Sequence, residues 1–431
     1  MDEGRFRRAV HRLKAFVKRG FLEEAGLLPR FRNGGLVIMS ETTLQVDDND
    51  RYSRLRLIPW WDQERLRQAC VLVVGAGALG NEVLKNLALV GVGHLIVVDF
   101  DVVEPANLTR SVLFRAGDRG RPKVEVAAEA TRELNPDLTV TAVYGNVLTS
   151  VGLGIFRDAD VVIGCLDNRE ARLWVNRCCW KVSTPWIDGG IQELNGVVKV
   201  FTPPDSACYE CGMTENDYRL INLRYSCPLL RQEDLTAGRV PTLPTIASLI
   251  GALQTQEALK LIHGLPVAGG EALVFNGTVS QSYRTRFQRR EDCLSHETYA
   301  APIELPLQAG RHTAADLFAE VRSHLGHGVL QLSLDRDLVV SLVCQRCGVQ
   351  QRVLQPLPLV GMRRALCPQC GELSRPQIVH AVEPNGDLAG ERLASLGIPP
   401  YDIVRVVSHT AEGTFLLAGD RREVMGSSAV P

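Results

Sequence analysis

The fold is decided by residues 71–101, which read VLVVGAGALGNEVLKNLALVGVGHLIVVDFD. An apolar run leads into Gly75-x-Gly77-x-x-Gly80, a helix-patterned segment follows, and a second apolar run ends at Asp99. This order predicts a strand, a tight glycine turn, a helix and a parallel strand. The glycines would serve the turn, the close approach of backbone to phosphate, and helix-to-strand packing. Asp99 follows Gly80 at about the 20-residue spacing where an acidic side chain meets a ribose hydroxyl. The stretch therefore predicts a nucleotide-binding α/β unit.

The segments that follow extend this unit into a larger sheet. Residues 140–148 and 158–168 are predicted as the third and fourth strands, the latter ending in a polar turn, and residues 171–182 as a helix. Residues 195–203 alternate like an antiparallel strand, and residues 245–263 are a strongly periodic helix. We therefore expect a doubly wound, Rossmann-like α/β domain, with ligands at the carboxyl edge of its strands.

The 431 residues are enough for two or three domains. Residues 1–50 are expected to be an N-terminal extension, helical with a basic face or partly disordered. Residues 51–300 form the predicted nucleotide domain, including a Pro- and Cys-rich crossover segment at about 204–244. Residues 301–431 are expected to form a smaller α+β region that contains a zinc ribbon.

Charge and hydropathy exclude several classes of protein. The net charge is −1 and the sequence pI is about 6.8, so no global field indicates binding to nucleic acid or to a membrane surface. No stretch is typical of a transmembrane span, and the N-terminus lacks the apolar core of a signal peptide. We expect a cytoplasmic protein.

Paired cysteines indicate two structural zinc sites. The spacing of Cys-x-x-Cys pairs 344/347 and 367/370, with 19 residues (348–366) between them, is typical of a zinc ribbon that supplies four thiolates to a tetrahedral ion. A third pair is completed by a Cys-x-x-His pair further along the chain, which would make a Cys₃His site. The predicted ligands are Cys208, Cys211, Cys293 and His296 for one site and Cys344, Cys347, Cys367 and Cys370 for the other.

Polar residues after the second and fourth strands suit a nucleotide whose phosphates react. Asn107, Arg110 and Lys123 follow the second strand, and Asp167 closes the fourth. Arginine and lysine neutralise phosphate oxygens, and a carboxylate can hold Mg²⁺ between phosphates. Solvated surface charges are the alternative. An NAD-dependent redox enzyme with the same fold is less favoured, because hydride transfer needs no Mg²⁺ ligand.

Several motifs in a fixed order give the chain a resemblance to the ubiquitin-activating (E1) superfamily, including its MoeB- and ThiF-type adenylyltransferases. The resemblance covers roughly residues 50–300. The motifs are RYSR (51–54), GAGALG (75–80), DFD (99–101), NLTR (107–110), the helix start at Lys123, CLDN (165–168), CYEC (208–211) and PTIAS (244–248).

This resemblance implies an enzyme that uses ATP and Mg²⁺ to adenylate the C-terminal glycine of a ubiquitin-like protein, with release of pyrophosphate. It implies that Asp99 holds the ribose, with Asp101 beside it, and that Asp167 binds Mg²⁺. The residues implied to contact phosphates are Asn107, Arg110 and Lys123. The second arginine of the RYxR motif, Arg54, would reach the site of a second subunit, so a homodimer is implied.

A thioester step is the next prediction. E1 proteins that form one carry a cysteine in the crossover segment, and here Cys227 lies there in the sequence SCPLLRQED. Its thiolate would attack the acyl adenylate and pass the carrier to an E2-like enzyme. One alternative is adenylation of a ThiS- or MoaD-like sulfur carrier without conjugation, and another is a non-catalytic partner, which the intact Arg110 and Asp167 disfavour. We expect residues 301–431 to be a binding module.

Overall fold

The computed structural model describes residues 47, 49–219, 241–326, 328–409 and 411–426. The predicted N-terminal helix and Cys227 lie outside these residues. The chain divides into two units, residues 1–57 and 58–431. The described part of the first unit holds a turn at residues 51–54 and the 3-10 helix η1 (Leu55–Leu57).

An eight-stranded sheet forms the centre of the second unit, in the order β3-β2-β1-β4-β5-β6-β7-β8. The first five strands of this order are parallel and the last three join by antiparallel pairs. The strand order reverses between β1 and β4, which is the switch point of a doubly wound fold. The bounds are β1 Cys70–Val74, β2 His94–Asp99, β3 Thr139–Tyr144, β4 Val161–Gly164, β5 Trp186–Gln192, β6 Asn195–Phe201, β7 Glu271–Asn276 and β8 Gln281–Arg286.

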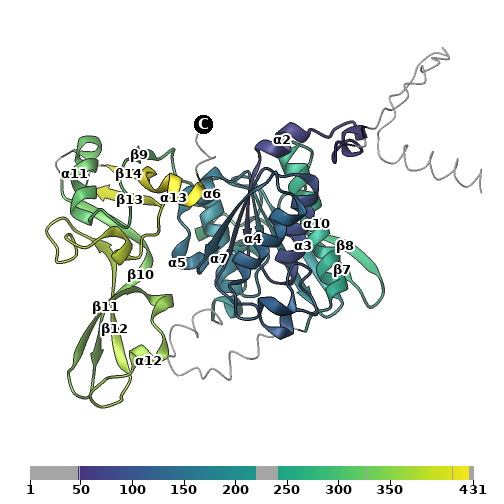
Figure 1. The fold of residues 1–431 in the computed structure, drawn as a ribbon. Coiled ribbons are helices and arrows are strands. Elements are labelled where there is room, and N and C mark those ends of the chain that lie inside the picture. The colour runs from purple at the N-terminus through teal and green to yellow at the C-terminus, as the bar shows by residue number, and fades with distance from the viewer. Residues whose placement is uncertain (1–46, 48, 220–240, 327, 410, 427–431) are drawn as a thin grey trace, which may run out of the picture. The chain divides into compact units, whose positions relative to one another are not determined.

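Helices cover both faces of this sheet (Figure 1). Successive side chains of each strand point to opposite faces, and here both sets are apolar. Val71 and Val73 pack with the helices of one face, whereas Leu72 and Val74 pack with those of the other. Buried apolar strands of this kind need a cover on each side. One face packs with α3 (Ala78–Val90), α4 (Lys123–Leu134) and α10 (Pro244–Ile262), and the other with α5 (Val147–Ser150), α6 (Leu153–Asp158) and α7 (Arg169–Lys181). The predicted fold class is confirmed.

Three details of the sequence prediction were wrong. The fourth strand, predicted over residues 158–168, is limited to Val161–Gly164, because Asp158 ends helix α6 and residues 165–168 lie beyond the strand. The third strand ends at Tyr144, and Leu148 belongs to helix α5 because the side chain of Asn146 accepts a hydrogen bond from the Leu148 N–H and caps that helix. Strand β8, with the sequence QSYRTR, was not predicted. All six of its residues are exposed at the sheet edge, so it carries no apolar face for a pattern to reveal.

A second sheet forms the C-terminal region, in the order β11-β10-β13-β14-β9, with β12 also paired to β10. Helix α11 (Ala314–Leu325) packs on it, and its capping box closes through Thr313 and Asp316. The other bounds are β9 Ile303–Leu305, β10 Leu330–Cys344, β11 Gln350–Pro356, α12 Met362–Ala365, β12 Ser374–Val382, β13 Ile403–Ser408, β14 Glu412–Leu417 and α13 Arg421–Met425.

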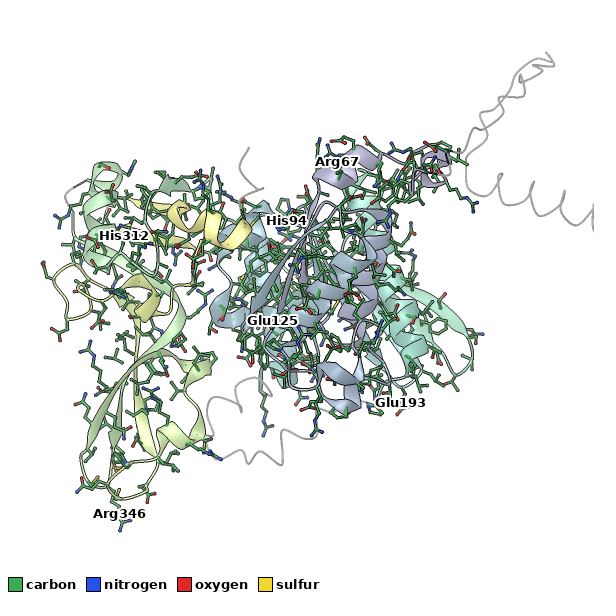
Figure 2. All side chains as sticks on the ribbon, in the orientation of Figure 1. Arg67, His94, Glu125, Glu193, His312 and Arg346 are labelled. Carbon is green, nitrogen blue, oxygen red and sulfur yellow. The ribbon has the colours of Figure 1, made fainter. Side chains whose placement is uncertain are left out.

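Strand β10 extends beyond the body of this sheet. Its first residues pair with β13, and residues 338–344 pair with β11 and β12 to form a three-stranded projection. We call residues 338–379 the ribbon arm. Arg346, labelled in Figure 2, lies at the end of this arm.

Buried polar contacts join the C-terminal region to the helices of the nucleotide domain. The Arg336 guanidinium donates to the carbonyl oxygens of Leu148 (2.5 Å) and Val151 (3.3 Å) and pairs with Asp402 at 3.1 Å. Asp402 in turn accepts from the Leu153 N–H at 2.7 Å. Arg336 and Asp402 are 8% and 3% exposed, so the base of the ribbon arm is anchored. Among the described residues, no helix has the length and apolarity that a bilayer crossing requires.

Candidate active site and metal clusters

The three glycines of the loop after β1 differ in what surrounds them. Gly75 has φ of +101°, and a Cβ added to it would lie 2.4 Å from the Cys165 carbonyl oxygen. A Cβ on Gly80 would lie 2.0 Å from the Gly75 carbonyl oxygen. Gly77, the N-cap of α3, has no atom within 4 Å of such a Cβ and lines a cavity. Gly75 and Gly80 therefore shape the turn, and Gly77 leaves room at the helix start.

Two carboxylates at the end of β2 lie beside this loop. Asp99 accepts hydrogen bonds from the backbone N–H groups of Ala76 (2.7 Å) and Asp101 (2.8 Å). Burial raises the pKa of the Asp99 carboxyl, and the nearby Lys123 ammonium and these N–H donors oppose that rise. The Lys123 ammonium pairs with Asp101 at 2.8 Å. Asp99 is thus held in place next to the glycine loop.

The other residues predicted to contact phosphates or Mg²⁺ line the same cavity, which has a volume of about 1950 Å³. Asn107 accepts from the Glu104 N–H at 2.9 Å, and Arg110 donates to the Ala106 carbonyl at 2.8 Å. Helix α4 begins at Lys123. Asp167 is exposed in the turn after β4. The fold thus brings to one cavity residues that are far apart in sequence: Gly75, Gly77, Asp99, Asp101, Asn107, Arg110, Lys123 and Asp167.

Arg54 belongs to the first unit, where its side chain is exposed. The role across a dimer that the sequence implies for it stays a prediction.

A buried charged network beside Asp167 was not predicted from the sequence. Asp188 is fully buried in β5 and accepts from Arg172 at 2.7 Å and from Lys199 at 3.1 Å. Arg172 also donates to the carbonyl of Leu166, the residue before Asp167, at 2.5 Å. The sequence does contain a signal for this network, namely the aspartate inside the apolar strand WIDGG. A buried carboxylate needs a cationic partner, so this aspartate could have predicted an ion pair. This network supports the turn that carries Asp167.

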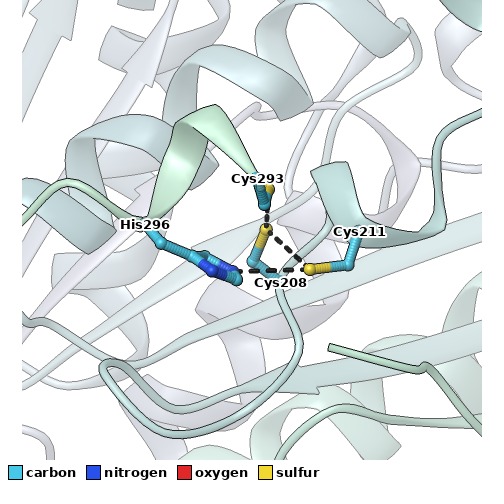
Figure 3. A group of neighbouring side chains, drawn as sticks. All are labelled: Cys208, Cys211, Cys293 and His296. Atoms are coloured by element: carbon cyan, nitrogen blue, oxygen red, sulfur yellow. Dashed lines mark hydrogen bonds between the residues drawn. The ribbon is translucent and has the colours of Figure 1, made fainter. Parts of the chain in front are cut away.

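The first predicted metal cluster assembles next to α7 (Figure 3). The donor atoms of Cys208, Cys211, Cys293 and His296 all lie within 4.8 Å of one another. The hydrogen bond from Cys208 lowers the pKa of Cys293, and burial lowers the pKa of His296, which favours the thiolate and the neutral imidazole that a metal ion binds. The Nδ1 atom of His296 is buried without a hydrogen-bond partner. A Cys₃His set with these properties fits Zn²⁺.

Glu210 connects the two halves of this cluster. It lies between Cys208 and Cys211, and its buried carboxylate accepts from the Ser295 hydroxyl in η6 (Leu294–His296). It also accepts from Arg177 at 2.8 Å and from the Tyr218 hydroxyl at 2.7 Å. These bonds hold the crossover segment against the end of the nucleotide domain.

The second cluster lies in the ribbon arm and consists of two matching turns. The Gly348 N–H donates to the Cys344 carbonyl at 3.0 Å, and the Gly371 N–H donates to the Cys367 carbonyl at 2.9 Å. Both glycines have positive φ, of 74° and 72°. The sulfurs of Cys344, Cys347, Cys367 and Cys370 lie within 4.8 Å of one another. Four thiol donors in this arrangement fit a structural Zn²⁺.

Fold and cavity together define a class of protein. A doubly wound sheet carries a glycine loop, a half-buried acid at the end of β2, and side chains able to contact phosphate at the switch point. These are the features of a nucleotide-binding α/β enzyme.

Comparison with known proteins identifies the family. The sequence profile described as ThiF family matches residues 50–295. The Escherichia coli (strain K12) protein described as sulfur carrier protein ThiS adenylyltransferase is 34% identical over 254 residues, which are 58% of this chain and 96% of that protein. The SAMP-activating enzyme E1 of Haloferax volcanii is 34% identical over 257 residues, 58% of this chain and 90% of that enzyme.

A solved structure of E. coli MccB with ATP aligns with a TM-score of 0.49 and 24% identity, over 59% of this chain and 75% of that one. The sequence comparisons establish that the chain belongs to the ThiF family, and it is an E1-like adenylyltransferase. The predicted resemblance is confirmed.

Proposed function

We propose that this enzyme uses Mg-ATP to adenylate the C-terminal glycine of a small ubiquitin-like sulfur carrier of the ThiS or MoaD type. The observation that carries the proposal is the convergence of the glycine loop, Asp99, Arg110, Lys123 and Asp167 on one cavity. The relatives favour sulfur carriers over conjugated modifiers. They include the ThiS adenylyltransferase described above and a molybdopterin-synthase adenylyltransferase of Salmonella typhimurium, which is 31% identical over 249 residues.

In this proposal the reaction is an in-line displacement at the α-phosphate. A carboxylate oxygen of the carrier's C-terminal glycine forms a bond to phosphorus, the bond between phosphorus and the bridging oxygen of the β-phosphate breaks, and pyrophosphate leaves. Such a reaction needs positioning and neutralisation of charge. Asn107, Arg110 and Lys123 would contact phosphate oxygens, and Asp99 would hold the ribose. The exposed carboxylate of Asp167 is suited to Mg²⁺, which neutralises phosphate charge when bound.

The dimer and the thioester are the finer parts of the proposal. Arg54 would complete the phosphate site of a second subunit.

A thioester on Cys227 would form by attack of its thiolate on the carbonyl carbon of the acyl adenylate, with AMP leaving. Within the described ranges, the cysteines outside the metal clusters are poor nucleophiles, because burial raises the pKa of the thiol of Cys70, Cys165, Cys178 and Cys179. If the enzyme forms a thioester, Cys227 is therefore the proposed nucleophile.

Exchange of radiolabelled pyrophosphate into ATP tests the proposal. We expect exchange that requires a carrier, tested with E. coli ThiS, a MoaD-type protein and H. volcanii SAMP. Asp167→Asn should reduce exchange by about 100-fold or more, as loss of one transition-state contact does. Asp205→Asn, an exposed carboxylate outside the cavity, should leave exchange unchanged. Absence of exchange with every carrier would refute the proposal.

Non-reducing gels then decide between sulfur-carrier activation and conjugation. A thiol-sensitive adduct with the carrier in the wild type, lost in Cys227→Ala while exchange persists, would establish the thioester. Exchange without an adduct in either protein would favour sulfur-carrier activation alone.

A further inference from the structure

The cavity of the adenylation site extends to the ribbon arm. Small-molecule pockets usually have volumes of about 300–1,000 Å³, whereas this cavity measures about 1950 Å³. Its outer wall belongs to residues far along the chain from the glycine loop. They include Leu357, Pro358, Val360, Met362, Leu373 and Arg375. The volume beyond the nucleotide motifs is therefore enclosed in part by the C-terminal region.

The part of the cavity wall that the ribbon arm forms is apolar and is bordered by basic residues. Met362 is 44% exposed although it lines the cavity. The sequence from Cys344 to Pro376 contains five arginines (346, 352, 363, 364 and 375), one glutamate (372) and no aspartate or lysine. Arg375 lies on the cavity wall and is exposed. Arg352 pairs with Glu391 and Arg346 with Glu372, whereas no ion pair among the described residues joins Arg363, Arg364 or Arg375 to an acidic side chain. An apolar surface bordered by these arginines suits an apolar segment carried by an acidic partner.

The arm is held where this contact could be made. Arg336 of β10, at the base of the ribbon arm, is bound to Leu148 and Val151 of the nucleotide domain through their carbonyl oxygens. Lys181 of α7 pairs with Asp335 at 2.7 Å. Burial of the Arg336–Asp402 pair makes this attachment costly to break.

We propose that the ribbon arm, through Met362, Leu357 and Arg375, binds the acidic carrier protein at its extended C-terminal tail while the terminal glycine is adenylated. This inference rests on the proposed function. We choose the carrier's tail as the occupant because one cavity joins the nucleotide site to the arm. A carrier whose carboxylate reaches the α-phosphate must place its preceding residues in that same cavity. An extended tail advances about 3.3–3.6 Å per residue, so the residues that precede the terminal glycine lie progressively further from the nucleotide along the cavity.

Matched variants test the proposal by pyrophosphate exchange with the carrier that the wild type uses. Met362 and Leu359 lie in neighbouring turns and are 44% and 47% exposed, but Leu359 does not line the cavity. We expect Met362→Ser to raise KM for the carrier by about tenfold, as loss of one buried apolar side chain does, with KM for ATP unchanged. Leu359→Ser should keep both constants.

A second pair tests the charge. Arg375→Glu should raise KM for the carrier and weaken its dependence on salt. Arg346 lies at the end of the arm (Figure 2) and does not line the cavity, so Arg346→Glu should behave as the wild type. Zinc content and melting temperature check that each variant is folded.

The outcomes separate the two proposals. Absence of carrier-dependent exchange in the wild type refutes the proposed function. Exchange in the wild type with unchanged carrier KM in both Met362→Ser and Arg375→Glu refutes the role of the arm alone. If Met362→Ser changes the oligomeric state at unchanged carrier KM, the surface is an interface between copies of the chain, and the proposal also fails.

Discussion

Replacing Gly77 by alanine should separate nucleotide binding from folding. A methyl group at this position meets no atom within 4 Å, and the residue has φ of −75°, which alanine adopts without strain. The remaining cost is the poorer N-cap, about 0.5–1 kcal/mol. Gly80→Ala is the matched control, because its methyl would lie 2.0 Å from a backbone oxygen that cannot rotate away. Overpacking of this kind costs about 1–3 kcal/mol or more.

Gly77→Ala, which should have little effect on stability, should strongly weaken nucleotide binding. The methyl of Gly77→Ala would occupy the space in which a phosphate approaches the N-terminus of α3. Loss of one hydrogen bond to a charged group costs about 1.5–3 kcal/mol. We therefore expect KM for ATP to rise by about 10- to 100-fold.

Thermal melting and titration with ATP measure the two effects. Gly77→Ala should melt within a few degrees of the wild type and bind ATP weakly, whereas Gly80→Ala should melt clearly lower. Wild-type affinity for ATP in Gly77→Ala would refute the reasoning, as would equal losses of melting temperature in the two variants.

Two further predictions concern the C-terminal region. Arg336→Ala should lower the free energy of unfolding by about 3–5 kcal/mol, because it leaves Asp402 buried without its cation. Arg352→Ala, which breaks an exposed pair, should cost less than about 1 kcal/mol in the same urea titration, and equal losses would contradict this account. The purified protein should carry about two zinc ions per chain by atomic absorption, and Cys344→Ser about one. Two ions in that variant would show that the cluster in the ribbon arm is not a zinc site.

The core of the fold could be predicted because its signals are local. The loop from Gly75 to Gly80 and the flanking apolar runs define a strand–turn–helix–strand unit, and the paired cysteines 344/347 and 367/370 define a ribbon by spacing alone. Strand β8 could not be predicted, because its pairing to β7 at the sheet edge stabilises a wholly exposed segment. The Arg172–Asp188 pair was missed because a cation on one helix is matched to a buried acid on a strand by packing.

The sequence by itself determined the class of fold, the glycine loop and the identity of the candidate metal-donor residues, since each depends on residue type at short spacing. The tertiary structure brought the predicted pairs Cys208/Cys211 and Cys293/His296 together, and it alone decided that Met362 and Arg375 share a cavity with Gly77. Those residues are separated by long stretches of chain. The approach of the two cysteine-containing pairs depends on strand order, and the approach of Met362 and Arg375 depends on the buried contacts of Arg336. No local pattern encodes either.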